Sequence, residues 1–402
     1  MKNIVILALG SRGDIYPYAT LGEALVKRGY GATFITTRDF APFIQARGME
    51  TVALPADGME TVNAIGTNTI HLMRAFLEIS FRILDEWDTF APWFARAHLL
   101  INQLPGGLFG EEIEKTYNIP CLQAAVIPLT PTDTMPMMGF PNLYWIPGAN
   151  RATYQFSAFV GWAMIRHRVN QWRTSALQLP AAPLTGYAQK QFPILYGISP
   201  HLFPPPLDWP TNTHVTGYWY PHDKKWEPTN RLQHFLNKGE PPIFIGFGSM
   251  PVQNRVATEQ KVIDALTKVG MRGVIQTWGS FPLPEHVYQL EYAPYGWLLP
   301  RMAGLIHHGG AGTTAFGAAS GIPSMTVPFL FDQKFWGNRL AALGVGPRPI
   351  PFHQLTENKL AQAIHTMKNN RQMRTKAAEL GHKVRMESGT KTAVGLVESF
   401  LA

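Results

Sequence analysis

The sequence of 402 residues contains a single cysteine, Cys121. One cysteine cannot form an internal disulfide, so a disulfide-stapled extracellular scaffold is excluded and a cytoplasmic, reducing location is expected. Because Cys121 stands between Pro120 and Leu122, we interpret it as a small buried apolar residue rather than a catalytic thiol.

Metal-binding spacings and long apolar runs are also missing. The sequence has no Asp-x-Asp pair and no His and Cys cluster with ligand spacing, so no bound metal is expected. No stretch reaches the roughly 18 apolar residues that a transmembrane helix needs. The apolar residues Ile4 to Leu9 run directly into Gly10 to Asp14, so we interpret them as a first strand rather than a signal peptide.

Charged residues are few, at 15% against 46% hydrophobic residues, as in an ordered globular protein. The net charge of +8 is uneven, since residues 1–205 carry 15 Lys and Arg against 14 Asp and Glu, and the remainder carries 20 against 13. This excess suits an anionic ligand, although a solvated basic surface explains it equally well. No basic cluster is interleaved with aromatic residues, so nucleic acid is not an expected partner.

Short apolar strands alternate with helical patterns in both halves. In the first half, strands are expected at 3–9, 32–36 and 51–54, with helices at 18–28 and 40–46 between them. The alternation restarts near residue 242 and favours an α/β protein with parallel, doubly wound sheets. Because a chain of this length exceeds what one core usually holds, two domains are expected.

A proline run marks the expected domain boundary. Pro204 to Pro206 cannot extend a helix or a central strand and form a stiff linker. We therefore predict a first domain over 1–205, a second over 206–385, and a terminal helix over 386–402 that packs back on the first domain.

A glycine-rich turn in the second half has the geometry of a phosphate site. The apolar run 303–306 leads through His307 and His308 into three glycines, then into an alanine-rich helix. Glycines let the backbone approach an anion, and the amide groups and dipole of the helix N-terminus attract it. The alternative is that these small residues only allow close helix–strand packing, but the His pair and the later Asp332-Gln333 favour a site.

The stretch 128–154 combines Pro, Met and aromatic residues and shows no period. Long irregular loops in compact domains are usually functional or disordered, and the apolar content argues against disorder. Since methionines adapt to irregular apolar partners, we interpret the stretch as part of an apolar binding pocket, or else as a loop packed on its own core.

Several motifs, in the same order, resemble the inverting family-1 glycosyltransferases, which have the GT-B fold. The similarity is greatest to the sterol glucosyltransferase and glycopeptide-antibiotic branch. The motifs are 10–14 with Pro17-Tyr18, Phe247 to Met250, Trp297-Leu298 with Pro300-Arg301, 307–314, and Asp332-Gln333 with Phe335-Trp336. The resemblance implies two Rossmann-like domains facing each other across a cleft, the first binding an acceptor and the second a nucleotide sugar.

The resemblance also implies roles for individual residues. The diphosphate of the donor would be contacted by Ser11, Arg12, Ser249, His308, Gly310, Gly312 and Thr313. Asp332 and Gln333 would bind the hydroxyl groups of the sugar. Preorganised donors of this kind stabilise the charge of a departing nucleoside diphosphate, so no metal cofactor is expected.

Asp14 is the expected catalytic residue. It occupies the place of the general base of the family, and a carboxylate at the carboxyl edge of a sheet suits the deprotonation of an acceptor hydroxyl. The alternatives are that Asp14 caps the following helix and that Ser11 and Arg12 only shape the turn.

The donor side departs from the family at three positions. Phe316 stands where many members have a ribose-binding Glu, Tyr292 stands in place of a stacking Trp, and Tyr295 replaces a Gln. Tyr292, Tyr295 and Trp278 are the expected contacts of the nucleotide base. Recognition of the ribose must therefore differ from that in the family, and the departures leave both uridine and thymidine, and glucose or another hexose, open. UDP-glucose is the expected donor, with a dTDP-sugar as the alternative.

The expected acceptor pocket is apolar and joins residues from both halves. Its expected members are Met135, Met137, Met138, Phe140, Tyr144, Trp145, His71 and Trp336. The predicted function is transfer of a hexose, with inversion, to a hydroxyl of a lipophilic acceptor. The alternatives are an epimerase of nucleotide sugars and a binding protein without turnover. A monomer or weak dimer is expected, and basic residues near Arg371 and Lys383 either contact a membrane surface or are simply solvated.

Overall fold

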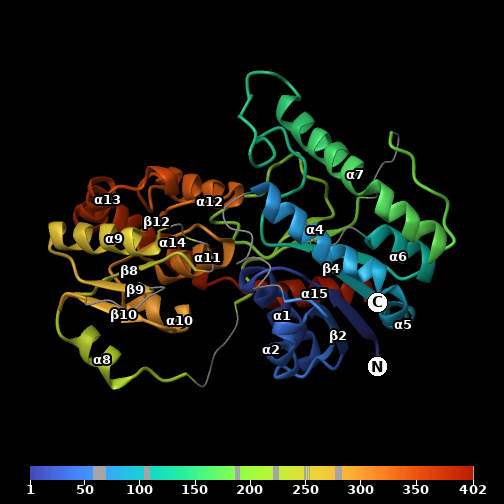
Figure 1. Ribbon diagram of the computed structural model, residues 1–402, viewed down its shortest axis with the longest axis horizontal. Coiled ribbons are helices and arrows are strands. Elements are labelled where there is room, and N and C mark those ends of the chain that lie inside the picture. Colours follow the sequence, from blue (N-terminus) through green and yellow to red (C-terminus); the bar gives the residue numbers. More distant parts are fainter. Residues whose placement is uncertain are drawn as a thin grey trace.

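The computed structural model describes most of the chain (Figure 1). The described residues are 1–57, 69–103, 109–185, 191–220, 226–248, 250, 252, 254–276 and 283–401. They form one half around a seven-stranded sheet and another around a five-stranded sheet, both parallel. The predicted α/β architecture with two parallel, Rossmann-like sheets is confirmed.

The first sheet has the order β3-β2-β1-β4-β5-β6-β7. Its strands are β1 (Asn3–Leu7), β2 (Gly31–Thr37), β3 (Glu50–Leu54), β4 (Leu99–Gln103), β5 (Cys121–Ala125), β6 (Ile194–Tyr196) and β7 (Thr213–Val215). Side chains alternate along a strand, so Ile4 and Ile6 enter one buried cluster while Val5 and Leu7 enter another. Burial on both faces explains why β1 is a continuous apolar run.

Helices cover both faces of this sheet. They are α1 (Arg12–Lys27), α2 (Ala41–Gln45), α4 (Thr69–Asp85), α5 (Trp87–Ala95), α6 (Gly110–Tyr117) and α7 (Ala149–Ser175), with a 3-10 turn at Arg38–Phe40. The strand order reverses between β1 and β4. A ligand crevice forms at such a reversal. The turn after β1 and the first turn of α1 place Ser11 to Asp14 at this crevice.

The second sheet has the order β10-β9-β8-β11-β12. Its strands are β8 (Ile243–Gly246), β9 (Gly273–Gln276), β10 (Val287–Leu290), β11 (Gly304–His307) and β12 (Ser324–Thr326). The helices are α8 (Asn230–Asn237), α9 (Arg255–Val269), α10 (Tyr295–Leu298), α11 (Ala311–Ser320), α12 (Phe331–Ala342), α13 (Glu357–Asn369) and α14 (Arg371–Arg385). Short 3-10 turns lie at Leu299–Arg301 and Phe352–Gln354. Here the order reverses between β8 and β11, so the glycine turn after β11 lies at the second crevice.

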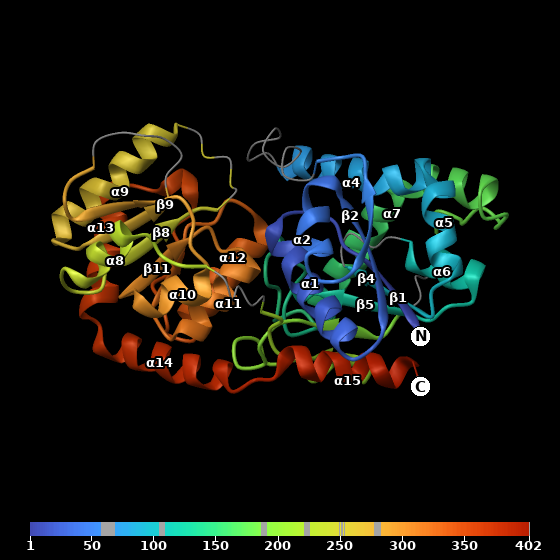
Figure 2. The ribbon, with the colours of Figure 1, turned by 90° about the horizontal axis from the view of Figure 1, so that it is seen from below.

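The two halves share a buried cluster. It joins Ala125 and Tyr196 of the first sheet to Ala315 of α11 and Trp336 of α12. Helix α15 (Gly389–Leu401) also links the halves, because it continues from α14 and packs on α1 with an ion pair of 3.0 Å between Arg28 and Glu398 (Figure 2). These contacts fix the orientation of one crevice toward the other.

Two features differ from the sequence expectation. Pro204 to Pro206 lie in the loop between β6 and β7, so the first sheet extends past the expected boundary at 205. The stretch expected to be irregular to residue 154 becomes helix α7 at Ala149. Apolar residues on the outward side of α7, such as Phe156 and Phe159, hide its helical period.

Candidate functional site

The glycine turn after β11 presents free backbone amides. Gly309 has a φ of 101°, and a Cβ atom there would lie 2.7 Å from the carbonyl oxygen of Gln333, so only glycine fits. Among the described residues, none accepts a hydrogen bond from the amides of Ala311, Gly312 or Thr313, the first residues of α11. Such a helix N-terminus is a ready anion site.

His308 lies against this turn, between two glycines. A Cβ atom added to Gly310 would lie 2.4 Å from its Nε2, and one added to Gly248 would lie 3.1 Å from its Cε1. Burial lowers the pKa of His308 to about 4, so the ring is neutral near pH 7, and its buried Nδ1 has no partner among the described residues. A neutral imidazole with a free ring nitrogen can hydrogen-bond to a phosphate oxygen.

His307 has a different environment. It ends β11, it is fully buried, and its Nδ1 accepts a hydrogen bond of 3.1 Å from the amide of Gly309. This contact supports the shape of the turn, and the predicted role of His308 as the phosphate contact stays a prediction.

Asp332 and Gln333 lie in the first turn of helix α12, but their side chains have different environments. The Oε1 of Gln333 accepts hydrogen bonds from the amides of Phe329 and Leu330, at 2.8 and 3.1 Å, and its Nε2 contacts the sulfur of Met250. Gln333 is therefore committed to shaping the loop before α12, and its predicted contact with the sugar stays a prediction. Burial, followed by the negative charge of Asp14, raises the pKa of Asp332 to about 6.

Asp14 sits in the first turn of α1 and is held by Ser11. One of its carboxylate oxygens accepts hydrogen bonds from the backbone amide and the hydroxyl of Ser11, at 2.9 and 2.8 Å. A Cβ atom on Gly10, whose φ is 126°, would lie 2.7 Å from the same oxygen. Burial raises the pKa of Asp14, which makes its carboxylate a better base. The capping alternative is thus realised in the structure, and no hydrogen bond from a described residue occupies the other carboxylate oxygen.

The two crevices meet at this point. A Cβ atom on Gly312 of α11 would lie 3.9 Å from the Cα atom of Gly13 in α1. Tyr295 hydrogen-bonds to Thr313. This bond and the positive charge of Arg12 both counteract the rise that burial causes in the pKa of Tyr295. The phosphate-type turn, a sugar-binding candidate and a candidate base therefore surround one site formed by both halves.

Aromatic residues surround Phe316, the position at which many members of the resembling family have a ribose-binding Glu. The ring of Phe316 lies 5.0 Å from Tyr220 and 6.0 Å from Tyr295. Tyr292 is half exposed. Ser249 and Trp278, predicted to contact the diphosphate and the base, lie outside the described residues, so their roles stay predictions.

The predicted acceptor residues lie in different environments. Met135 packs against the cluster between the halves, which puts it close to the site. Trp336 corrects the expectation, since it is fully buried in that cluster and packs the junction instead of lining an open pocket. Tyr144 and Trp145 are largely exposed. His71 is in α4, but its side chain is outside what the structure describes.

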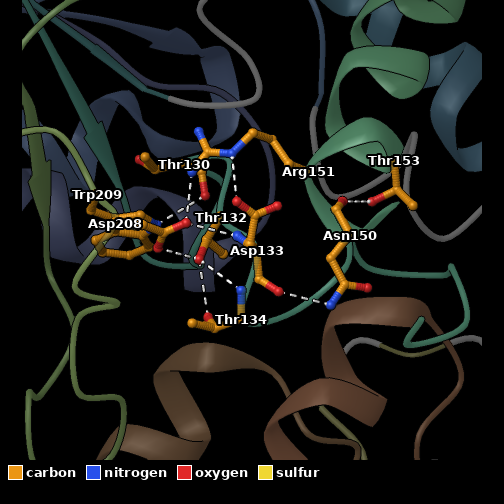
Figure 3. A network of polar contacts seen from close by, with 9 residues as sticks. All are labelled: Thr130, Thr132, Asp133, Thr134, Asn150, Arg151, Thr153, Asp208 and Trp209. Carbon is orange, nitrogen blue, oxygen red and sulfur yellow. Dashed lines mark hydrogen bonds and ion pairs between the residues drawn. The ribbon is translucent and has the colours of Figure 1, made fainter. Parts of the chain in front are cut away.

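A polar network that the sequence did not reveal fixes the start of the irregular stretch before helix α7 (Figure 3). Asp208 accepts hydrogen bonds from the Thr132 hydroxyl, at 2.6 Å, and the Asp133 amide, at 2.8 Å, and it pairs with Arg151 at 2.6 Å. Burial alone would raise the pKa of Asp208, but these bonds offset it and hold the pKa below its ordinary value. Asp208 lies far from Thr132 in the chain, so no local pattern could indicate the contact.

The described residues contain neither a metal-binding cluster nor a membrane-spanning helix. No group of three or more His, Cys, Asp or Glu in the described part of the chain could hold a metal ion. None of the described helices has the length and apolar character required to span a bilayer.

Two family models match the chain. The glycosyltransferase family 28 N-terminal domain matches residues 4–92, and the C-terminal domain of erythromycin biosynthesis protein CIII-like proteins matches residues 264–394. Sterol 3-beta-glucosyltransferases of Yarrowia lipolytica and Debaryomyces hansenii are 29% and 30% identical over 97% and 98% of this chain. The chain spans only 28% and 26% of those relatives.

Solved antibiotic glycosyltransferases share the fold. The glycosyltransferase of kitacinnamycin is 18% identical, with a TM-score of 0.73, over 100% of this chain and 99% of that one. The Streptomyces enzyme SsfS6, solved with thymidine diphosphate, is 16% identical, with a TM-score of 0.67, over 99% and 100% of the two chains.

The two parallel sheets form the GT-B fold that the antibiotic glycosyltransferases have. In the two matched stretches the chain is similar to the family 28 and erythromycin-CIII-like type, and it is a distant relative of the sterol 3-beta-glucosyltransferases. The resemblance seen in the sequence is thereby confirmed, with a family 28 model matching its first domain.

Proposed function

We propose that the protein transfers a hexose, glucose in the first place, from a nucleoside diphosphate sugar to a hydroxyl of a sterol-like acceptor. The observation that carries this proposal is the placement of Asp14 and Asp332. They lie in opposite halves of the chain, yet the charge of Asp14 helps to raise the pKa of Asp332. The similarity to sterol 3-beta-glucosyltransferases supports the sterol-like acceptor.

The chemistry follows from the groups around the site. The diphosphate is bound by the free amides of α11 and by His308, and these groups stabilise the negative charge that develops as it leaves. Asp14 removes the proton from the acceptor hydroxyl, whose oxygen attacks the anomeric carbon opposite the leaving group. One displacement of this kind inverts the anomeric centre.

Asp332 has a separate role in this proposal. Its carboxylate accepts hydrogen bonds from hydroxyl groups of the sugar and keeps the anomeric carbon between the diphosphate and the acceptor. The aromatic group of Tyr220, Phe316 and Tyr295 replaces a ribose-binding carboxylate, so recognition of the nucleotide relies on stacking and shape. We propose UDP-glucose as donor, with dTDP-glucose as the alternative that the thymidine diphosphate complex of SsfS6 suggests.

The test is a donor-consumption assay with both nucleotide sugars and a panel of apolar alcohols, including sterols. Formation of a glucoside whose anomeric configuration is opposite to that of the donor, established by proton NMR, is expected. Donor conversion without an acceptor would instead indicate an epimerase. Tight nucleotide binding without any turnover would indicate a binding protein.

A further inference from the structure

The chain leaves the first half for the second at residues 216–220, directly after β7. Thr216 to Trp219 are buried, and Tyr220 is half-buried. The two aromatic residues at the end of this segment, Trp219 and Tyr220, are neighbours in the chain but pack on different helices. One of these helices belongs to each half.

Trp219 packs on helix α1, which carries Asp14. Its side chain is 2% exposed and shares a buried cluster with Ile15 and Tyr18. The centroid of its ring lies 5.9 Å from that of Tyr18, in an edge-to-face arrangement. The indole Nε1 donates a hydrogen bond of 2.9 Å to the Thr216 hydroxyl, so the indole has one fixed orientation against α1.

Tyr18 links this contact to the candidate base. It follows Asp14 by four residues, so both side chains lie on the same side of α1. Burial, followed by the negative charge of Asp14, raises the pKa of Tyr18. The Tyr18 hydroxyl donates a hydrogen bond of 2.9 Å to the carbonyl of Ala124 in β5. Trp219 therefore packs on α1 one turn after Asp14, where the helix is anchored to the first sheet.

Tyr220 packs on helix α11, whose N-terminus is the proposed diphosphate site. Its hydroxyl donates a hydrogen bond of 2.9 Å to the carbonyl of Ala315, and the centroid of its ring lies 5.0 Å from that of Phe316. Ala315 and Phe316 follow the amides of residues 311–313 in the same helix. Tyr220 therefore anchors α11 close to the proposed diphosphate site.

The two helices meet at their N-termini through small residues. A Cβ atom on Gly312 of α11 would lie 3.9 Å from the Cα atom of Gly13 in α1. Ala311 packs against the buried cluster that contains Trp219. Contacts between so few atoms restrain two helices only weakly, whereas the hydrogen bonds of Trp219 and Tyr220 are directional.

We propose that Trp219 and Tyr220 are positioning residues, which set the distance and the angle between Asp14 on α1 and the diphosphate site on α11. This role rests on the proposed sugar transfer, in which the two groups act on opposite sides of the anomeric carbon. A displacement of about 1 Å between reacting groups can lower a rate about 10²-fold. Two adjacent residues, each attached to the helix of a different half, restrict such a displacement.

The experiment compares Tyr220→Phe, which removes only the hydroxyl group, with the unmodified protein. We expect kcat at saturating donor and acceptor to fall about tenfold, because α11 is no longer held in register with α1. The affinity for uridine and thymidine diphosphates, measured by titration calorimetry, is expected to change less than about twofold, since the amides of α11 and His308 are intact.

Tyr288→Phe is the matched control. Tyr288 is a half-buried tyrosine of β10, at the edge of the second sheet, and its hydroxyl contacts that of Thr229 at 3.5 Å. Its loss is expected to leave kcat unchanged. A second pair of variants tests the other residue, since Trp219→Phe keeps a ring against Tyr18 and is expected to retain more activity than Trp219→Leu.

A double-mutant cycle with Asp14→Asn separates positioning from a general structural role. If Tyr220 acts by aligning Asp14, Tyr220→Phe should change the residual kcat of Asp14→Asn less than about twofold, because no base remains to be aligned. A general loss of structure would lower kcat by the same factor in both backgrounds.

The role is overturned if Tyr220→Phe has the kcat of the unmodified protein, or if its loss of kcat is equally large in the Asp14→Asn background. It is also overturned if nucleotide affinity falls in proportion to kcat, or if Trp219→Leu is as active as Trp219→Phe. In these cases the unmodified protein still transfers sugar, so the proposed function stands. Absence of transfer by the unmodified protein would instead overturn the proposed function, and this role with it.

Discussion

Asp14 and Asp332 come from different halves of the chain, yet the negative charge of Asp14 contributes to raising the pKa of Asp332 to about 6, after burial. Two carboxylates in one partly buried site cost free energy in the empty protein, because each disfavours the ionised form of the other. A ligand that donates hydroxyl groups to one carboxylate and a proton to the other would relieve this cost. The pair is therefore the part of the structure that points most directly to transfer chemistry.

Asp14→Asn is expected to lower kcat for sugar transfer by about 10²–10⁴-fold, since it removes the general base. Nucleotide affinity is expected to stay within a factor of about two, because Asn can accept the hydrogen bonds of Ser11 that shape the turn. Steady-state kinetics and calorimetric titration with the nucleoside diphosphate measure the two effects. Asp264→Asn on α9 is the control. Transfer by Asp14→Asn at the unmodified rate would show that another group is the base.

Asp332→Asn is expected to stabilise the empty protein at pH 7 by about 1–2 kcal/mol while abolishing most of its activity. The folded-state pKa lies above the unfolded value, so the contribution of this group to stability is present at low pH and is lost as pH rises through about 6. The loss develops between the ordinary pKa of 3.8 and about 6, so urea unfolding at pH 3.5 and pH 7.5 measures it, and the gain should nearly vanish at the lower pH. An equal gain at both values would contradict the assigned ionisation.

Activity is also expected to depend on pH around the same value. The Asp332 carboxylate must be ionised to accept hydrogen bonds from the sugar, so kcat/KM for the donor should fall as pH drops through about 6. A profile of kcat/KM against pH, with stability checked at each point, measures this. A flat profile between pH 5 and 7 would argue against contact between Asp332 and the sugar.

Gly310→Ala is expected to weaken nucleotide binding about tenfold or more, since the new methyl group would stand 2.4 Å from Nε2 of His308 and displace the ring. Titration calorimetry with uridine and thymidine diphosphates measures the loss. Gly395→Ala in α15 is the matched control, because a Cβ atom there meets nothing within 4 Å. Equal affinity in both variants would mean that His308 does not contact the diphosphate.

Asp208→Asn is expected to raise KM for the acceptor about threefold to tenfold and to leave KM for the donor unchanged. The charge of Asp208 holds Thr132, the Asp133 amide and Arg151 together, and so fixes the loop that carries Met135, a predicted acceptor contact. The ratio of the two KM values in steady-state kinetics checks this. Parallel changes in both would point to a general loss of structure.

The sequence by itself determined the features that depend on short stretches of chain. Apolar runs predicted most strands, and the glycines after His308 predicted the turn, because a φ of 101° at Gly309 needs glycine. Pattern could not show that helix α7 begins at Ala149, since outward-facing Phe156 and Phe159 remove its amphipathic period. The pattern also could not show that Pro204 to Pro206 lie in the loop between β6 and β7, two strands of the first sheet.

Only the tertiary structure decided which residues share the site. The shared cluster around Tyr196 and Trp336, together with the return of α15 to α1, orients the two crevices so that the charge of Asp14 acts on Asp332. The same packing buries Trp336, which the sequence placed in the acceptor pocket. Contacts of this kind join residues far apart in the chain, and their geometry depends on how whole faces pack, which no local pattern encodes.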